Sequence, residues 1–419
     1  MLSTSTHTIA KLLQVDIGSI EQVNFTGVYT DTREPMQGGL FIALIGENFD
    51  AHNYIDKAKE MGAVAILACR HVKSTLPVIQ VADTQLAMAK IATWHRDNIA
   101  PTVVAITGSN GKTTTKNMLK NILSLKAPTL ATQGNLNNHL GVPMTLLRLK
   151  KEHRYAVIEM GANHLGEINR LRQIAKPNVA VVTNTGDAHI GEFGGFENLV
   201  KAKGEIFSPA SKNIVNTKCQ YQGDIYFGNN GDVFAINLDG ASFELNFNGE
   251  KTPIKLSLLG MHNIENALAA SACAFALGID SQTIKNGLEK TQAEKGRLNF
   301  ISTTQFNLID DTYNANPKAM RSALNVLSGF SGEKVAVFGA MAELGKSSKS
   351  MHQEIGDIAK KASDYFYSCG HGAKSYNTTH FENLDELANH IKAKHQKATI
   401  LIKASRSAHL ENLVAKLQK

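Results

Sequence analysis

The chain has 419 residues, of which 43% are hydrophobic and 19% are charged. These are globular proportions, and the length suggests two to four domains at roughly 150 residues each, which excludes a wholly disordered chain. Lysine and arginine (44) exceed aspartate and glutamate (37), giving a net charge of +7. This mild excess includes no long basic run. It therefore gives no argument for a nucleic-acid partner and fits anionic small-molecule substrates.

Cysteine usage and apolar patterning predict the compartment. The four cysteines, Cys69, Cys219, Cys273 and Cys369, are too widely spaced for a zinc motif or a disulfide framework, which favours a reducing cytosol. The N-terminal residues lack the apolar stretch of a secretory signal, and no apolar run approaches the roughly 18 residues of a membrane span. We therefore expect a cytoplasmic protein without a membrane partner.

Residues 1–83 are predicted to form a small α/β domain. Apolar runs at 40–46, 64–69 and 76–83 favour strands, and 54–63 favours a helix between the first two. Asp83 or Thr84 is expected to begin a helix that Pro101 ends, so we place the first domain boundary at residue 83.

Residues 84–295 are predicted to form a central domain. Near-continuous apolar runs at 103–107, 155–161 and 179–184 are typical of strands buried on both faces, and so of a parallel sheet covered by helices. Residues 216–259, rich in Asn, Gly and Asp, favour an antiparallel meander inserted into this domain. An alanine-rich helix at 263–278 is expected to close at Gly278.

Residues 296–419 are predicted to form a third, Rossmann-like α/β domain. Its expected strands are 306–311, 334–339, 365–370 and 398–403, with helices between them. The predicted fold class is therefore α/β in three domains, of which the central one combines a parallel sheet with an antiparallel insert.

Residues 106–116, ITGSNGKTTTK, lie between an expected strand and an expected helix, which is the setting of a phosphate loop. Glycines allow backbone N–H groups to face an anion, the lysine supplies a positive charge, and the helix N-terminus adds its dipole. The plainer alternative is an ordinary glycine turn, since Ile106 stands where the consensus has glycine. The predicted nucleotide-binding residues are Gly108, Ser109, Asn110, Gly111, Lys112, Thr113 and Thr114.

The stretch TGSNGKTT resembles the phosphate loop of the Mur ligases, the ATP-dependent amide-forming enzymes of peptidoglycan precursor synthesis. Their loop also lacks the first glycine, and the resemblance extends over essentially the whole chain. Within the family, DDTYNANP (310–317) and GAMAELG (339–345) resemble the members that add D-alanyl-D-alanine to UDP-N-acetylmuramoyl-tripeptide. The resemblance implies that activity, with ATP and two Mg²⁺ ions, in a monomer.

Two Mg²⁺ sites are implied by the family resemblance. Glu159 ends the strand beside the phosphate loop, where a carboxylate can hold the metal of a bound nucleotide. The resemblance pairs Glu159 with Thr113 on the first ion and places His189 and Lys203 at the second. Lys203 would be carbamylated there, or would pair with phosphate as an unmodified lysine. The plainer alternatives are a solvated carboxylate, a structural histidine and a surface lysine.

Nucleotide contacts are also expected outside the phosphate loop. Asn263 and Asn266 share one face of the alanine-rich helix and resemble the family's adenine contacts. Arg297, just after the second domain boundary, is expected to stabilise phosphate charge, and Asp311, at a strand end, to accept from ribose hydroxyls. The residues expected to serve the chemistry are Lys112, Glu159, His189, Lys203 and Arg297.

Substrate contacts are implied in all three domains. Thr30, Asp31, Arg33, Asp50 and His52 resemble the family's UDP-sugar site. The polar loop at 134–143 offers Asn137 and Asn138 to the nucleotide and the sugar-peptide, and Asn314, Asn316 and Glu343 are expected to face the incoming dipeptide.

Two other activities remain as alternatives. One is a related ligase of the MurE or folylpolyglutamate-synthase type, against which the segments at 310–317 and 339–345 argue. The other is a phosphate-loop ATPase that switches a protein partner, against which the UDP-sugar motif argues.

Overall fold

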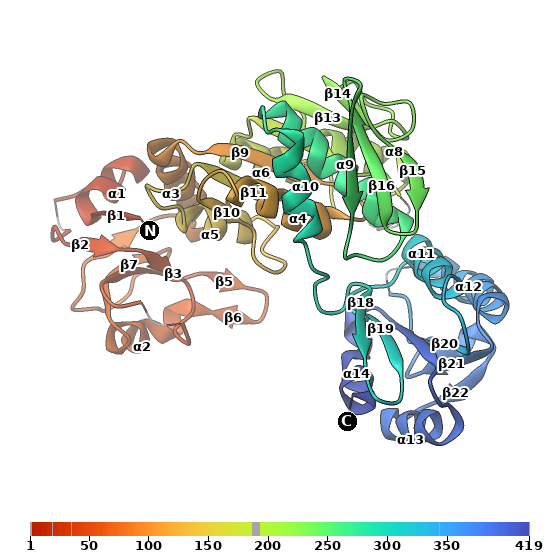
Figure 1. The fold of residues 1–419 in the computed structure, drawn as a ribbon. Coiled ribbons are helices and arrows are strands. Elements are labelled where there is room, and N and C mark those ends of the chain that lie inside the picture. Colours follow the sequence, from red (N-terminus) through yellow and green to blue (C-terminus); the bar gives the residue numbers. More distant parts are fainter. Residues whose placement is uncertain (1, 19, 35, 187–192, 343, 419) are drawn as a thin grey trace.

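The computed structural model describes residues 2–18, 20–34, 36–186, 193–342 and 344–418 (Figure 1). Three α/β units follow one another along the chain, each built on a sheet that contains parallel strands. The predicted α/β fold class is confirmed. The exact domain boundaries stay predictions.

The N-terminal unit contains a parallel sheet in the order β3-β4-β7-β8. Two short antiparallel pairs, β1-β2 and β5-β6, flank it. Asp83 caps the helix that leads into the next unit, because its side chain accepts hydrogen bonds from the amides of Gln85 and Leu86. The elements are β1 (Ser3–Ser5), α1 (Thr6–Leu13), β2 (Asn24–Thr26), β3 (Val28–Tyr29), β4 (Gly39–Ile42), β5 (Ile45–Gly46), β6 (Phe49–Asp50), η1 (Ala51–Tyr54), α2 (Ile55–Glu60), β7 (Ala63–Ala68), β8 (Val78–Gln80) and α3 (Thr84–Ile99).

The central unit is built on a sheet in the order β10-β11-β9-β12-β13-β14-β15-β16-β17. Side chains of β9 alternate between two cores: Val103 and Ala105 face one cluster, Val104 and Ile106 the other. The elements are β9 (Thr102–Thr107), α4 (Lys112–Ser124), β10 (Thr129–Ala131), α5 (Gly141–Leu147), β11 (Tyr155–Glu159), α6 (Glu167–Ala175), β12 (Val179–Val182), α8 (Phe196–Gly204), β13 (Lys212–Asn216), β14 (Ile225–Phe227), β15 (Val233–Asp239), β16 (Ser242–Phe247), β17 (Glu250–Lys255), α9 (Met261–Ala276) and α10 (Ser281–Glu289).

The predicted antiparallel meander is present but covers less than the predicted segment 216–259. β14 pairs in parallel with β13 and β15, and only β15, β16 and β17 pair antiparallel with one another. All of them extend the central sheet, because the outer strands continue its hydrogen-bond ladder. Asn, Gly and Asp mark the turns of such a segment, but do not tell which strand each turn leads to.

The C-terminal unit contains a sheet in the order β18-β19-β23-β20-β21-β22, parallel except for the β18-β19 pair. The four predicted strands correspond to β19, β20, β21 and β23, whereas β18 and β22 lie at the edges and were not predicted. The elements are β18 (Asn299–Ser302), β19 (Asn307–Asp311), α11 (Pro317–Ser328), β20 (Lys334–Phe338), η2 (Gly345–Ser347), α12 (Ser348–Ala362), β21 (Tyr365–Cys369), η3 (Ala373–Tyr376), β22 (Thr379–Phe381), α13 (Leu384–Lys394), β23 (Thr399–Lys403), η4 (Arg406–Ala408) and α14 (Glu411–Leu417).

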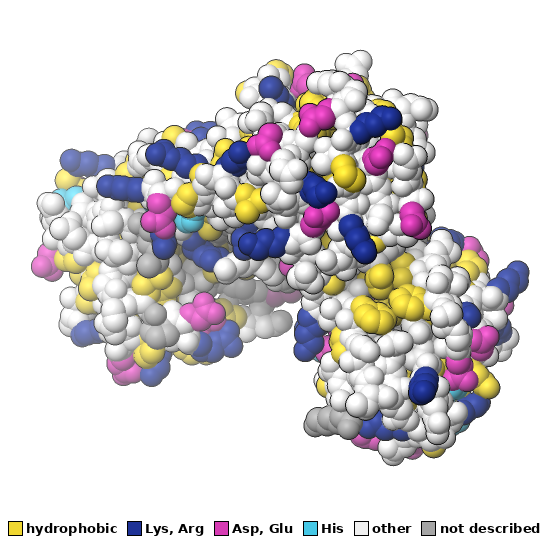
Figure 2. All heavy atoms as spheres, in the orientation of Figure 1, with side chains coloured by type: hydrophobic (Ala, Val, Ile, Leu, Met, Phe, Trp, Pro, Cys, Tyr) yellow, Lys and Arg dark blue, Asp and Glu magenta, His cyan; other side chains and the backbone are white. Residues whose placement is uncertain are grey.

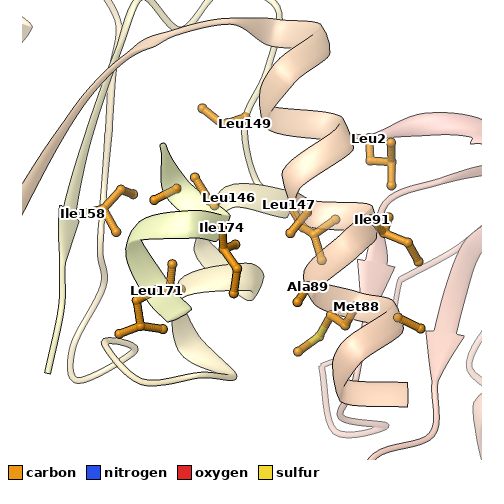
Figure 3. Packing of buried hydrophobic residues seen from close by; sticks show 14 of the residues in the cluster. Leu2, Met88, Ala89, Ile91, Leu146, Leu147, Leu149, Ile158, Leu171 and Ile174 are labelled. Atoms are coloured by element: carbon orange, nitrogen blue, oxygen red, sulfur yellow. The ribbon is translucent and has the colours of Figure 1, made fainter. Parts of the chain in front are cut away.

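The N-terminal and central units share one hydrophobic core. Helix α3 buries Met88 and Ile91 in a cluster that also contains Leu2 of the first unit and Leu146 and Leu171 of the second. Figure 3 shows α3 facing α5 and α6 on one side, with Leu2 on the other. The apolar contact on both sides of α3 fixes the first unit against the second.

On the face shown in Figure 2, basic and acidic side chains are interspersed over the three units. None of the helices in the described part of the chain combines the length and apolarity that a membrane span requires.

Candidate active site

A cavity of about 600 Å³ lies where the central and C-terminal units meet. It opens over the carboxyl ends of the central strands, where parallel α/β sheets place their ligands. Its lining includes sixteen of the residues that the sequence analysis singled out: Ser109, Asn110, Gly111, Lys112, Thr113, Thr114, Asn137, Asn138, Glu159, Lys203, Asn263, Asn266, Arg297, Asp311, Asn314 and Asn316.

The phosphate loop needs its two glycines. Gly108 has a φ of 145°, and a Cβ there would lie 2.0 Å from Thr183 Oγ1. Gly111 has a φ of 81°, and a Cβ there would lie 2.1 Å from Asn266 Oδ1. Because any larger side chain would be strained and would clash, the loop can pass this close to Thr183, after β12, and to Asn266 of α9 only with glycine. Lys112 begins α4 and donates from Nζ to the Gly108 carbonyl over 2.7 Å.

Asn263 and Asn266 form a buried pair on α9 above this loop. Asn263 Nδ2 donates to the Leu259 carbonyl over 2.7 Å, and Asn266 Nδ2 donates to Asn263 Oδ1 over 3.0 Å. These bonds fix the two amides at the start of α9, where Asn266 Oδ1 lies close to Gly111 of the phosphate loop. The expected contact with adenine stays a prediction.

Glu159 has one engaged and one free carboxylate oxygen. The residue is 2% exposed, and Oε1 accepts a hydrogen bond from Asn137 Nδ2 over 2.8 Å. Oε2 is buried, and nothing in the described part of the chain donates to it. A buried carboxylate oxygen without a partner is costly, and a hard cation satisfies it.

The donor set fits Mg²⁺ bound together with nucleotide phosphates. Mg²⁺ is held by one or two carboxylates, a hydroxyl, waters and phosphate oxygens, and Glu159 and Thr113 supply the first two of these ligand types. Within the described ranges, no group of three or more His, Cys, Asp or Glu residues could hold a metal ion by itself. The protein's contribution to such a site is therefore a partial shell that a nucleotide would complete.

Lys203 is 2% exposed, on α8. Its Nζ donates to the Ala162 carbonyl over 3.3 Å and lies 5.0 Å from the ring centroid of Phe193. Burial and the positive charge of Lys112 lower the pKa of Lys203 to about 7. A substantial share of this amine is therefore neutral near neutral pH, which a surface lysine would not show.

Arg297 joins the C-terminal unit to the phosphate loop. Its Nη2 donates to Thr113 Oγ1 over 3.1 Å, and its guanidinium lies 4.0 Å from the ring centroid of Tyr313. Nε is buried without a hydrogen-bond acceptor in the described residues, although Glu294 Oε2 is 3.7 Å away. The stacked ring orients a guanidinium that still has donors for an anion.

Four more residues of the C-terminal unit, Asp311, Asn314, Asn316 and Lys403, line the cavity. Asn316 caps α11 and donates from Nδ2 to Asn110 Oδ1 over 3.0 Å. Lys403, 2% exposed, lies with Nζ 2.6 Å from Asp311 Oδ2 and donates to the Asn314 carbonyl over 2.7 Å. Asp311 is thus ion-paired, and its other oxygen, Oδ1, accepts from the Leu298 amide. Its expected ribose contact and the expected dipeptide contacts of Asn314 and Asn316 stay predictions.

Lys116 was not selected from the sequence. It is 2% exposed and donates from Nζ to the Thr132 carbonyl over 2.9 Å, while Thr132 Oγ1 accepts from the Glu159 amide. It therefore supports the backbone that carries Glu159. The sequence feature that could have identified it is its position one helical turn after Lys112, on the same face of α4.

The predicted UDP-sugar residues lie outside this cavity, in the N-terminal unit. Arg33 forms an exposed ion pair with Asp31, 2.6 Å apart. Asp50 Oδ1 lies 2.6 Å from His52 Nδ1, and Thr30 follows β3. The structure brings Asp50 and His52 together but does not bring the five residues to the cavity lining.

Two predicted residues, His189 and Glu343, lie outside the described residues.

The backbone of residues 341–342 is held by two side chains. His352 Nε2 accepts from the Met341 amide over 2.9 Å, and Ser405 Oγ accepts from the Ala342 amide over 2.7 Å.

Comparisons with known proteins identify the family. A model of the Mur ligase middle domain matches residues 106–274, and one of the Mur ligase glutamate ligase domain matches residues 296–419. The UDP-N-acetylmuramoyl-tripeptide–D-alanyl-D-alanine ligase of Escherichia coli (strain K12) is 40% identical, covering 98% of each chain. The chain belongs to the Mur ligase family. The predicted family resemblance is therefore confirmed.

Solved structures agree with this Mur ligase over its whole length. MurF from Acinetobacter baumannii superposes with a TM-score of 0.94 at 39% identity, covering 100% of this chain and 99% of that one. MurF from Thermotoga maritima, solved with ADP, gives a TM-score of 0.85 at 30% identity, covering 94% and 97%.

Proposed function

We propose that the chain is an ATP-dependent ligase that joins D-alanyl-D-alanine to UDP-N-acetylmuramoyl-tripeptide. The observation that carries the proposal is the contact of two units in one cavity, where Arg297 reaches the hydroxyl of the phosphate-loop Thr113. Relatives that carry the name of this activity are similar over nearly the full chain. Neither observation favours the MurE-like or the regulatory-ATPase alternative.

The reaction runs in two displacements. A carboxylate oxygen of the tripeptide attacks the γ-phosphorus of ATP, so that ADP leaves and an acyl phosphate forms. The amine of D-alanyl-D-alanine then attacks the acyl carbon, the C–O bond to phosphate breaks, and inorganic phosphate leaves as the amine proton is lost. The enzyme's work in both steps is positioning and charge stabilisation.

Residues of both the central and the C-terminal unit contribute to this positioning and charge stabilisation. Lys112 and the loop amides before α4 bind phosphate oxygens, and Arg297 offsets the charge that builds on the transferred phosphoryl group. Thr113 and Glu159 would hold a first Mg²⁺, and Lys203, with His189, a second. Bound Mg²⁺ supplies neutralisation of phosphate charge.

The remaining predicted residues would contact the three substrates, which are ATP, the UDP-sugar peptide and the dipeptide. Asn263, Asn266 and Asp311 would contact the nucleoside of ATP. The N-terminal residues Thr30, Asp31, Arg33, Asp50 and His52 would hold the UDP-sugar, with Asn137 and Asn138 along the sugar-peptide, and Asn314, Asn316 and Glu343 would receive the dipeptide.

Phosphate release measured with purified protein tests the proposal. Release should require ATP, Mg²⁺, UDP-tripeptide and D-alanyl-D-alanine together, and the product should carry a pentapeptide. Phosphate release with UDP-dipeptide and a single amino acid would instead support the MurE-like alternative. Release from ATP alone would support the regulatory ATPase.

We also infer that the protein acts as a monomer in the cytoplasm. The relatives named for this activity are similar over nearly the full chain, and the family resemblance implies a monomer. Light scattering at the protein concentration of the assay should give the mass of one chain.

A further inference from the structure

The two residues proposed to hold the first Mg²⁺ come from different elements of the central unit. Thr113 lies in the first turn of α4, and Glu159 is the last residue of β11. Mg²⁺ accepts oxygen ligands only at about 2.1 Å and in nearly octahedral directions. The site therefore depends on a fixed separation between a helix and a strand, which the residues of α4 or of β11 cannot set alone.

Lys116 reaches from α4 toward the edge of the central sheet. It follows Thr113 by three positions, so the two side chains share one face of the helix, and it is 2% exposed. Its Nζ donates to the Thr132 carbonyl over 2.9 Å. Thr132 directly follows β10, the strand at the sheet edge that pairs with β11. Lys116 thus links the helix of one Mg²⁺ ligand to the strand pair that carries the other.

Thr132 holds the end of β11 at two backbone positions. Its amide donates to the Val157 carbonyl over 3.0 Å, and its Oγ1 accepts from the Glu159 amide over 2.9 Å. Thr132 is itself 2% exposed, so water has little access to these bonds. A path of buried hydrogen bonds therefore runs from Lys116 through Thr132 to the backbone of Glu159, while Asn137 holds the carboxylate of the same residue.

The charge of Lys116 and its hydrogen bond would have opposite effects on a cation at this site. Burial lowers the pKa of Lys116, and Glu159 is the largest of the charges that oppose this shift. An ammonium group near the carboxylate repels Mg²⁺, so its charge alone would weaken metal binding. The hydrogen bond keeps the residue that carries the carboxylate in place, which would strengthen metal binding. The direction in which Mg²⁺ affinity changes on removing Lys116 therefore tells which effect is larger.

We propose that Lys116 is a positioning residue that, through Thr132, fixes Glu159 at the distance from Thr113 that a bound Mg²⁺ requires. Among the described residues that line the cavity, neither Lys116 nor Thr132 is present, so their effect on the metal is indirect. A buried lysine is costly, and its hydrogen bond to Thr132 offsets part of that cost. The inference rests on the proposed function only in placing Mg²⁺ and ATP in this cavity.

Nucleotide binding with and without Mg²⁺ tests the proposal separately from turnover. The affinity of the full-length protein for a non-hydrolysable ATP analogue is measured by calorimetry in excess Mg²⁺ and again in EDTA. The ratio of the two affinities is the gain that the metal provides. Lys116→Met, which keeps an unbranched side chain but donates no hydrogen bond, should reduce this gain by about tenfold, as for residues that support a metal ligand. A general loss of phosphate attraction would lower both affinities but not their ratio.

Substitutions at Thr132 provide a second test in which the lysine is kept. Thr132→Val preserves the shape of the side chain but removes the oxygen that accepts from the Glu159 amide, so it should also reduce the gain. Thr132→Ser keeps that oxygen and should stay near the wild-type gain. Thermal melting followed by circular dichroism checks that each variant is folded. If Lys116→Met does not fold, the two Thr132 variants decide the proposal.

Lys120→Met is the matched control. Lys120 lies one turn further along α4 and is exposed, so its replacement removes the same charge from the same helix without affecting Thr132. Its gain should equal that of the wild type. A gain in Lys116→Met that equals or exceeds the wild-type value would overturn the proposal, and so would equal gains in Thr132→Val and Thr132→Ser.

Formation of the pentapeptide product is assayed separately, so that the proposed function and the role of Lys116 can fail independently. A wild-type gain that falls in Lys116→Met and Thr132→Val upholds the positioning role even if no product forms from D-alanyl-D-alanine. Product formation by a wild type whose nucleotide affinity does not depend on Mg²⁺ would uphold the ligase activity. It would remove both the metal at Glu159 and the role of Lys116.

Discussion

Arg297 donates a hydrogen bond to Thr113 over 3.1 Å, and this contact connects the start of the C-terminal unit to the first turn of the phosphate-loop helix. The two residues are 184 positions apart in the chain. With ATP bound as we propose, this guanidinium would lie beside the γ-phosphate and offset the charge that moves during phosphoryl transfer.

Replacing Arg297 should therefore reduce turnover more than stability. We expect Arg297→Ala to lower kcat by about a hundredfold or more, the range found when one charge-stabilising donor is removed. Arg297→Lys should recover only part of it, because lysine lacks the planar fork. Arg321→Ala, which removes a partly exposed ion pair with Glu354 in the same unit, is the control and should leave kcat near wild type. Near-normal kcat in Arg297→Ala would remove Arg297 from the phosphoryl-transfer step.

Lys112→Ala should abolish most ligase activity with the fold intact. The side chain lies at the start of α4 and is held to the Gly108 carbonyl, so its loss removes a phosphate-binding charge without opening a hydrophobic core. Lys120→Ala, on the exposed side of the same helix, is the matched control. Phosphate release and thermal melting followed by circular dichroism check the two halves of this prediction. Retention of turnover in Lys112→Ala would contradict the phosphate-loop assignment.

Glu159→Gln should raise the Mg²⁺ concentration needed for half-maximal activity by about tenfold or more, the order seen when a metal's supporting contacts are lost. The amide preserves the size of the side chain but replaces the free buried oxygen, or the one that Asn137 binds, with an NH₂ group. Mg²⁺ titrations of ATP-dependent phosphate release provide the measurement. Glu152→Gln, at an exposed position, is the control. Superimposable titrations of Glu159→Gln and wild type would exclude Glu159 from the metal site.

His189→Ala provides the corresponding test of the second predicted metal site. We expect it to weaken that site, so that its Mg²⁺ titration differs from those of both wild type and Glu159→Gln. A titration identical to wild type would remove His189 from the metal shell.

Much of the fold was predictable because its parallel strands are buried on both faces. Runs such as 103–107 and 179–184 are apolar throughout, and they became β9 and β12 at the centre of the sheet. The edge strands β18 and β22 were missed because an edge position needs neither the same burial nor the same apolar run. The sequence also did not predict that α3 packs against both the N-terminal and the central unit, since an amphipathic pattern does not tell which unit covers each face of a helix.

The candidate site was predictable residue by residue, but its internal contacts were not. Gly111 and Asn266 were each selected for a separate motif, yet the close approach of one to the other decides why the first must be glycine. Likewise, the buried Lys403 forms an ion pair with the partly buried Asp311 at 2.6 Å between adjacent parallel strands. Such contacts follow from strand order, which local patterns do not encode.

Lys203 gives a prediction that separates two chemical forms of one residue. Carbamylation requires a neutral amine, and the pKa of about 7 for Lys203 means that raising the pH through neutrality deprotonates it. In protein equilibrated with carbon-labelled bicarbonate, a carbamate signal in the NMR spectrum should therefore grow between about pH 6 and pH 8. It should be absent from Lys203→Ala and present in Lys201→Ala, an exposed lysine on the same helix.

Activity should respond in parallel if the carbamate is a metal ligand. Lys203→Ala should lose most of its turnover and regain part of it with added acetate or propionate, because a free carboxylate can occupy the space that the side chain leaves. Lys203→Arg should stay inactive, since a guanidinium cannot form the carbamate. An active Lys203→Arg, with no labelled signal in wild type, would show instead that Lys203 acts as a cation that pairs with phosphate. The second metal would then have to be held without it.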